Sequence, residues 1–308
     1  MSFGKRINRL WLFGLVALAG LIGAGYLILS NGTQAAITRG LFNREAIIAR
    51  ADAANIKSFF EAVGNSVALR AQLRSMHRSD TTTSDDLDAF VEQWRDSGLV
   101  AGIILTNSQG VVILNSNVRN TPDVGESLAD RDYFAWAKNQ KKEGEYYVGQ
   151  PVVSPLGASK GQVIVPVASP VFANGVFQGA VSAAVKLQPL VQRDLELMKV
   201  SDRTNVYLIG QDGGLLYSSP GSRVLGDDVK KMLNITKLSQ VQKDGLLITY
   251  SPVTLKGQNW LLIVTLPIQE VSDSAIPMNI RQAAVLISVS LIVLVFGYAS
   301  VGKFRTKR

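Results

Sequence analysis

The stretch that decides the fold runs from Arg131 to Leu187 and begins Arg-Asp-Tyr-Phe-Ala-Trp-Ala at residues 131–137. These first residues indicate a short helical turn that brings a guanidinium and several aromatic rings beside a sheet. Strand-like runs follow, broken by glycines: Tyr146–Val153, Gln162–Val171 and Val176–Leu187. An arginine offers a planar fork of donors to a carboxylate or phosphate, and aromatic rings supply apolar surface. The pattern predicts a small-molecule pocket with an anion anchor. A surface salt bridge above two core rings is the plainer alternative.

The basic charge of the chain is concentrated at its two ends. The 308 residues carry a formal net charge of +8, yet residues 31–280 hold 24 Lys+Arg and 24 Asp+Glu. The excess lies in 1–30 and 281–308, where basic residues flank hydrophobic runs. A nucleic-acid-binding protein needs a basic face on its folded body, whereas basic residues beside apolar runs indicate membrane topology. We therefore expect a membrane protein with no nucleic-acid partner.

Two hydrophobic stretches predict transmembrane helices. The first covers residues 10–30, with its most apolar part at Leu10–Leu29, and the second covers residues 280–302, which carry no charge from Gln282 onward. About 20 apolar residues are enough to cross a bilayer as a helix. A cleaved signal peptide is the alternative for the first stretch, because a weak cleavage-like site, Thr33-Gln34-Ala35, follows it.

The flanking charges predict a two-pass protein of the inner (plasma) membrane. Lysines and arginines lie just before the first stretch and just after the second. They place residues 1–9 and the tail at 303–308 in the cytoplasm. Residues from about 31 to 279 are then periplasmic or extracellular. Because the first stretch contains small residues at Ala19-x-x-x-Gly23, we expect a homodimer packed along it and the helix that follows.

Apolar periodicity predicts helices on the exterior side. Residues 31–80 carry apolar side chains mostly three, four or seven apart, as in a long helix leaving the membrane. A second helix is expected at Asp85–Asp96, with Thr83 or Ser84 as its N-cap. A connecting helix is expected at 188–203.

β structure is predicted in two segments that repeat one scheme. They are a membrane-distal module at 81–187 and a membrane-proximal module at 204–275. Residues 104–112 can be laid over 207–215, and Ser169-Pro170-Val171 over Ser251-Pro252-Val253, in the same order. Two matches in the same order indicate two related modules in tandem.

The modules and their order resemble the double Cache (dCache, or PDC-type) sensor region of bacterial signal-transduction receptors. The residues that carry the likeness are these: Arg131-Asp132-Tyr133-Phe134, Tyr147–Val152, Val163–Val167 and Asn174–Val181. The likeness covers about residues 35–275. It implies an α+β fold in which tandem PAS-like modules with antiparallel sheets stand on a long N-terminal helix, flanked here by two transmembrane helices.

The resemblance also implies a ligand site in the distal module. Amino-acid-binding members have an arginine for the ligand carboxylate, an aromatic pair two and three residues later, and an aspartate on the last strand for the amine. Arg131 matches the arginine, and Tyr133 and Phe134 match the pair in type. The aspartate position falls near Ala184, and an upstream aromatic position falls at or near Glu126. This chain therefore has neither the aspartate nor the upstream aromatic residue.

We therefore expect Arg131, Tyr133, Phe134 and Tyr147 to bind a small anionic, carboxylate-type ligand. With no acidic partner at Ala184, a simple organic acid should bind better than a free α-amino acid. If a zwitterionic amino acid binds best, another acceptor, such as Asp132 or Glu126, must hold its amine.

No catalytic residue, metal site or cofactor is predicted. The chain has no Cys, and its one His, His77, ends a helical stretch. No P-loop or dinucleotide fingerprint occurs. We expect no enzyme, although a hydrolase using Ser and Lys stays open.

The expected function is a membrane-anchored sensor that signals to a cytoplasmic output module or partner. The chain ends at Arg308, six residues after Gly302, which leaves no room for an output domain. The alternatives are the sensor part of a longer cyclase, kinase or chemoreceptor, and a periplasmic scaffold that binds another protein.

Overall fold

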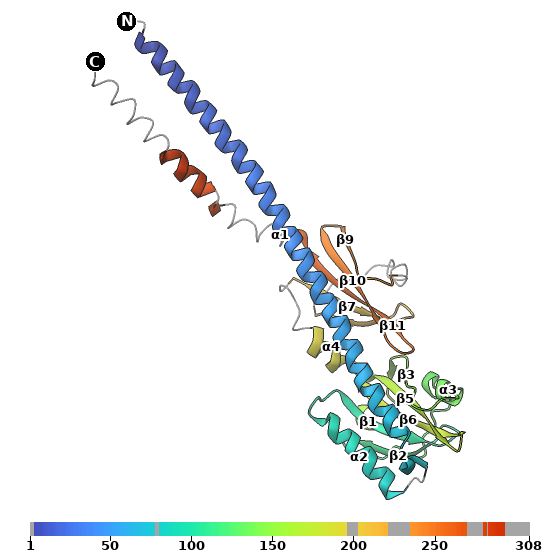
Figure 1. The fold of residues 1–308 in the computed structure, drawn as a ribbon. Coiled ribbons are helices and arrows are strands. Elements are labelled where there is room, and N and C mark those ends of the chain that lie inside the picture. The colour runs from blue at the N-terminus through green and yellow to red at the C-terminus, as the bar shows by residue number, and fades with distance from the viewer. Residues whose placement is uncertain are drawn as a thin grey trace. The chain divides into compact units, whose positions relative to one another are not determined.

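The computed structural model describes residues 3–77, 80–195, 203–220, 235–269, 280–281 and 283–292 (Figure 1). The chain divides into two compact units, of which the larger comprises Glu45–Gln242 and Ile248–Thr265. The smaller unit comprises Met1–Arg44, Lys243–Leu247 and Leu266–Arg308.

One helix, α1 (Phe3–Ala71), accounts for the first part of the chain. In the larger unit its buried residues recur three and four apart, so that one stripe faces the core. They are Ala49, Ala53, Ile56, Phe60, Val63 and Val67. At Gly64 the ring of Tyr146 lies against the helix backbone, where any Cβ would overlap the ring.

Within the smaller unit, Leu247 and Leu266 form an apolar cluster with Ile37, Leu41 and Phe42 of α1. Among the described residues, no helix is long and apolar enough to cross a membrane. The side chains of residues 10–16, 18, 19 and 30 in the first predicted span are outside the described part of the chain, as are residues 282 and 293–302 of the second.

The connection after α1 differs from its prediction. A 3-10 turn, η1 (Arg74–His77), leads into α2 (Thr81–Arg95), which begins four residues before the expected helix start. Asp80 is the N-cap: its carboxylate accepts from the backbone N of Thr83, whose hydroxyl accepts from the backbone N of Asp80. Such a reciprocal box satisfies two backbone donors, which explains the earlier start.

The first sheet is antiparallel, in the order β2-β1-β6-β5-β3, with β4 also paired to β5. Its strands are β1 (Val100–Thr106), β2 (Val112–Asn117), β3 (Tyr147–Val148), β4 (Val152–Val153), β5 (Val163–Ala173) and β6 (Val176–Lys186). The β5–β6 hairpin turns at Asn174 and Gly175, both at positive φ (51° and 78°), as a type I′ turn requires.

Strand alternation gives this sheet two distinct faces. Odd-numbered residues such as Ile103, Val165 and Val185 enter the core that also includes α1 and α2 residues. On the opposite face, Ala168 and Ala180 pack against α3 (Asp132–Lys138). The rest of that face is free to border a cavity.

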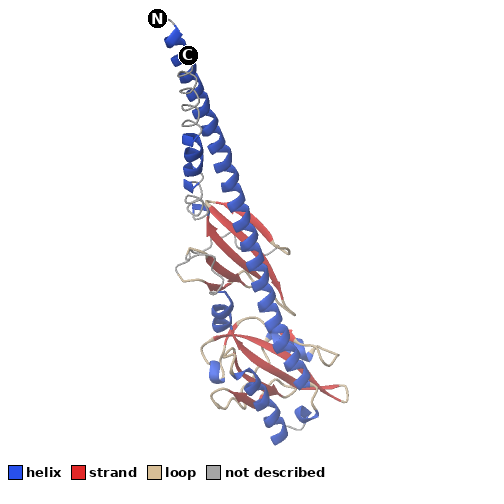
Figure 2. Ribbon diagram, turned by 60° about the vertical axis from the view of Figure 1, so that its left-hand side comes forward, coloured by secondary structure: helices blue, strands red, loops and turns tan. Residues whose placement is uncertain are grey.

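The second sheet has the order β8-β7-β11-β10-β9, and β7 pairs antiparallel with both β8 and β11. Its strands are β7 (Asn205–Ile209), β8 (Leu215–Ser218), β9 (Ser239–Lys243), β10 (Leu246–Thr254) and β11 (Asn259–Pro267). Helix α4 (Leu187–Leu195) leaves the first sheet, and residues 196–202 of the expected connecting helix are outside the described part. Figure 2 shows the strands of both sheets in red.

The two sheets repeat one strand order, which agrees with the two related modules that the internal sequence match predicted. In the first sheet the hairpin β2-β1 is followed by β6 and then β5. In the second sheet the hairpin β8-β7 is followed by β11 and then β10. The register of the first hairpin shifts between Leu105 and Thr106, and that of the second between Leu208 and Ile209. These are the positions that the sequence match places together, so the α+β fold with two related antiparallel modules is confirmed.

Candidate functional site

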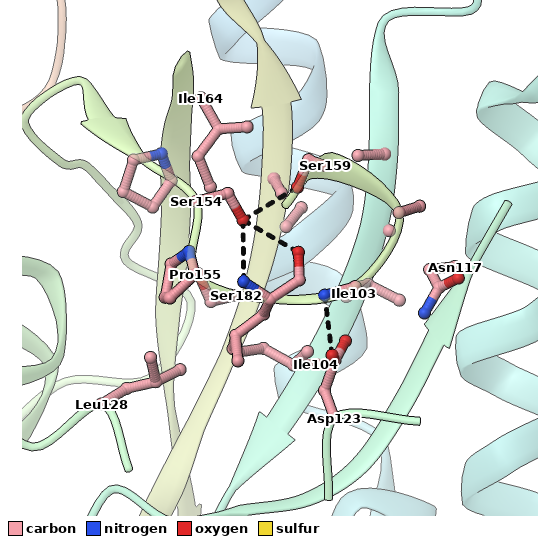
Figure 3. A pocket seen from close by; sticks show the side chains of 18 of the residues that line it. Ile103, Ile104, Asn117, Asp123, Leu128, Ser154, Pro155, Ser159, Ile164 and Ser182 are labelled. Carbon is pink, nitrogen blue, oxygen red and sulfur yellow. Dashed lines mark hydrogen bonds between the residues drawn. The ribbon is translucent and has the colours of Figure 1, made fainter. Parts of the chain in front are cut away.

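A cavity of about 60 Å³ lies in the distal module, on the sheet face turned away from α1 (Figure 3). Strands β1, β2, β5 and β6 contribute one side, and the segments around 123–133 and 152–159 contribute the other. A space of 10–15 Å³ is about enough for one water molecule, so the cavity has room for several water-sized groups. It fits a small ligand.

Small residues on the strands leave the space open. Gly102 and Ala184 line the cavity from neighbouring strands β1 and β6, where they pair with each other. A Cβ at Gly102 would lie 2.6 Å from the Cβ of Asn117, so only glycine fits between β1 and β2. Larger side chains at these positions would fill the cavity.

A short turn covers another side of the cavity. It consists of the segment after β4 and the 3-10 turn η2 (Gly157–Ser159). The Ser154 hydroxyl donates to the carbonyl oxygen of Leu156 at 3.0 Å and accepts from the Ser159 hydroxyl at 3.0 Å. These bonds hold the turn in one shape within the distal module (Figure 3).

Arg131 and Tyr133 line the cavity from the start of α3. Arg131 is the N-cap residue of that helix, and its side chain is 31% exposed. Its Nε lies 3.5 Å from Oδ1 of the exposed Asp130. Burial raises the pKa of Tyr133, an effect that the Arg131 charge partly offsets, so the phenol stays protonated.

Phe134 and Tyr147 differ from their predicted placement, because neither lines this cavity. Consecutive helical residues point about 100° apart. With Tyr133 at the cavity, Phe134 instead packs edge-on against Phe177, with 6.0 Å between ring centroids. Tyr147 pairs with Ala168, beyond the part of β5 that borders the cavity, and its ring stacks on Trp136 at 5.1 Å.

The alternative acceptors considered from the sequence are also outside the cavity lining. The Asp132 carboxylate accepts from the backbone N of Gln150 at 3.0 Å. Glu126 is exposed. Ala184 does border the cavity, so the position that resembles the family's aspartate position is apolar.

Asp123 is a cavity residue that the sequence did not single out. It is 9% exposed, and its Oδ1 accepts from the backbone N of Gly157 at 2.7 Å. Burial raises the pKa of Asp123, the Gly157 bond and Lys160 lower it, and Glu126 raises it further. No sequence motif marks this residue, since the loop that carries it meets the cavity only in the folded module.

The described residues hold no cluster of three or more His, Cys, Asp or Glu side chains suited to a metal ion. The cavity instead combines one guanidinium, one carboxylate, a phenol and serine hydroxyls with an apolar wall. That combination can bind a small polar molecule by hydrogen bonds.

Comparison with known proteins gives a family and a set of folds. A family model described as a Cache domain, dCache_1, matches residues 37–275. No curated protein sequence matches significantly. Several solved structures share the fold.

An extracellular ligand binding receptor from Desulfohalobium retbaense is 14% identical with a TM-score of 0.54; the match covers 71% of this chain and 39% of that receptor chain. The ligand-binding domain of the Pseudomonas fluorescens chemoreceptor CtaA, in complex with L-isoleucine, is 18% identical (TM-score 0.56, 78% of this chain and 98% of that one). The sensory domain of the Campylobacter jejuni chemoreceptor Tlp3 is 11% identical (TM-score 0.56, 79% and 99%). At identities this low, the structural similarity shows a shared fold and nothing more.

Proposed function

The chain belongs to the dCache_1 family of Cache domains, and on that basis we propose that it is an extracytoplasmic sensor, anchored in the membrane, for a small carboxylate-bearing ligand. The observation that carries the proposal is the cavity of the distal module with Arg131 in its lining. The similar CtaA domain was crystallised with an amino acid, which also carries a carboxylate.

Arg131 is the proposed anchor of the ligand carboxylate. Its side chain is only partly exposed, and guanidinium pairs with carboxylate through two parallel hydrogen bonds. The distance between Arg131 Nε and Asp130 Oδ1 is 3.5 Å, and the Asp130 side chain is exposed to solvent. This ion pair therefore competes only weakly with a ligand carboxylate. Tyr133 supplies a phenol next to this anchor.

Binding to the purified full chain tests the anchor. Calorimetry with short carboxylates should identify ligands whose affinity falls in Arg131→Ala and stays unchanged in Arg119→Ala, an exposed arginine outside the cavity lining. Equal affinity of the best ligand for wild type and Arg131→Ala would show that the anchor is wrong. If no small molecule binds at all, a protein-binding scaffold becomes the better reading.

Membrane anchoring and inward signalling are further parts of the proposal. The charge-free stretches at 10–30 and 282–302 and the basic residues that flank them support two spans with cytoplasmic ends. Reporter fusions test this: a reporter active only in the periplasm should work within 110–260 and fail at residue 5 and at 308. Activity at 308 would overturn the two-pass topology.

Signalling to a cytoplasmic output module or partner, without enzymatic activity of the chain itself, completes the proposed role. The unbroken helix α1 supports this route, because a rigid helix can carry a displacement along its axis. A homodimer along α1 is proposed with it. Single cysteines along Ile37–Val63 should cross-link with helical periodicity, and the native chain has no cysteine to interfere.

A further inference from the structure

We infer that the cavity also recognises a hydrogen-bond donor on its ligand, and that the Asp123 carboxylate is the acceptor. The inference rests on the proposed function and narrows it. The ligand class becomes a short carboxylic acid with a hydroxyl or amino group on the carbon beside the carboxylate.

The loop that carries Asp123 is held in place by two asparagines. Asn115 Nδ2 and Asn117 Nδ2 each donate to the carbonyl oxygen of Thr121 at 2.7 Å. Asn117 Oδ1 accepts from the backbone N of Thr121 at 3.1 Å, and Asn115 Oδ1 accepts from the backbone N of Asp123 at 3.3 Å. The carboxylate is therefore fixed at the cavity before any ligand arrives.

The turn on the opposite side is built around the same carboxylate. Gly157 donates its backbone N–H to Asp123 Oδ1, and a Cβ at residue 157 would lie 2.5 Å from Oδ2 (Figure 3). Gly157 also has a φ of +51°, in the left-handed region that glycine adopts most easily. A carboxylate can accept about four hydrogen bonds, and the Gly157 bond uses one of them.

The size of the cavity places both charged groups within reach of one small ligand. Arg131 and Asp123 line the same space of about 60 Å³. A small acid that fills this space with its carboxylate at Arg131 also borders Asp123, and the shortest such acids carry their second polar group on the carbon beside the carboxylate. The apolar Ala184 lies on the same cavity and leaves room for the ligand's carbon atoms.

The electrostatics favour a ligand that donates to Asp123. Burial is the largest effect on this carboxyl and raises its pKa, which means that the protein solvates its charged form less well than water does. A ligand N–H or O–H would replace the lost hydrogen bonds to water. A ligand with only methyl groups there would leave the carboxylate poorly solvated.

Propionate, lactate and alanine test the inference, because they share one carbon skeleton and differ in the group beside the carboxylate. Calorimetry on the purified full chain should give lactate, alanine or both about ten- to hundredfold tighter binding than propionate, the range expected for a hydrogen bond to a charged group. In Asp123→Ala this preference should disappear.

Asp123→Asn distinguishes the two donors and should fold, because its amide oxygen can still accept from Gly157. A preference for alanine should fall about tenfold or more in Asp123→Asn, whereas a preference for lactate should largely persist. Glu126→Gln, which neutralises an exposed acid of the same loop, is the matched control and should change neither.

Failure of this inference is separable from failure of the proposed function. If propionate binds wild type as well as the other two acids and still depends on Arg131, the Asp123 role is wrong and the carboxylate anchor stands. A preference that survives in Asp123→Ala also overturns the Asp123 role. If none of the three acids binds, the inference about Asp123 fails, and the carboxylate anchor is decided separately by the other short carboxylates and Arg131→Ala.

Discussion

The ring of Tyr147 lies directly on Gly257, so that any Cβ at residue 257 would overlap ring carbon Cε2. The residue next to Tyr147 makes a second contact with the same turn: the backbone N of Val148 donates to the carbonyl oxygen of Lys256 at 2.7 Å. Lys256 Nζ in turn lies 3.1 Å from Glu145 Oε2. Strand β3 of the distal module is thus joined to the turn between β10 and β11.

Gly257→Ala should destabilise the protein by about 2–4 kcal/mol, combining backbone strain with overpacking. The strain arises because Gly257 has a φ of +108°, and the overpacking because the Tyr147 ring occupies the Cβ position. Chemical denaturation would measure the loss. Gly161→Ala is the control, since Gly161 has a φ of +79° with no other atom within 4 Å of its Cβ position. Equal losses in the two variants would show that the Tyr147 contact contributes nothing.

Arg131→Ala should weaken the best carboxylate ligand about ten- to hundredfold, because a charge-assisted hydrogen bond to a carboxylate is lost. Arg131→Lys should recover part of that affinity, since an ammonium carries the charge without the bidentate fork. Isothermal titration calorimetry would rank the three proteins. Full recovery by lysine would mean that charge alone, without bidentate geometry, holds the ligand.

Phe134→Leu should lower the stability of the distal module while leaving ligand affinity within about twofold. The side chain packs on Phe177 and is outside the cavity lining, so its truncation removes core contacts at a typical cost of about 1–2 kcal/mol. Thermal melts and calorimetry on the same samples would separate the two effects. A large loss of affinity with unchanged stability would return Phe134 to the ligand site.

Glu45 should make the stability of the protein depend on pH. It is fully buried on α1, and burial raises its pKa to about 8, an effect that Thr249 partly offsets. In the unfolded chain a glutamate releases its proton at about pH 4.3. Between that pH and about 8, Glu45 therefore binds its proton more strongly in the folded state than in the unfolded state. Stability should therefore decrease as pH rises through this window, by as much as about 5 kcal/mol in total.

Glu45→Gln should remove that decrease, because its amide does not ionise. The variant should melt at a higher temperature than wild type at pH 8, with the difference shrinking toward pH 4. Glu61→Gln, a change at a half-exposed glutamate of the same helix, serves as the control. A wild-type pH profile that Glu45→Gln leaves unaltered would contradict the prediction.

The sequence by itself determined the α+β fold, with two related antiparallel sheets and a long N-terminal helix. Those features depend on local signals: the three- and four-residue spacing on α1, the glycine turns between strands and the repeated order of matched segments. It also singled out Arg131 and Tyr133, which line the cavity, because the start of a short helix next to a sheet is a local arrangement. The start of α2 was wrong by four residues because Asp80 forms a cap that competes with Thr83 and Ser84.

Only the tertiary structure decided which other side chains meet at the cavity. Asp123 reaches it because a loop pinned by Asn115 and Asn117 is brought to a turn 34 residues farther along the chain, and no periodicity records that approach. Tyr147 lies outside the cavity lining because the register of β3 on β5 places its ring against Trp136 and Gly257. Local patterns specify each element and its faces, whereas register and loop closure depend on contacts between segments far apart in the sequence.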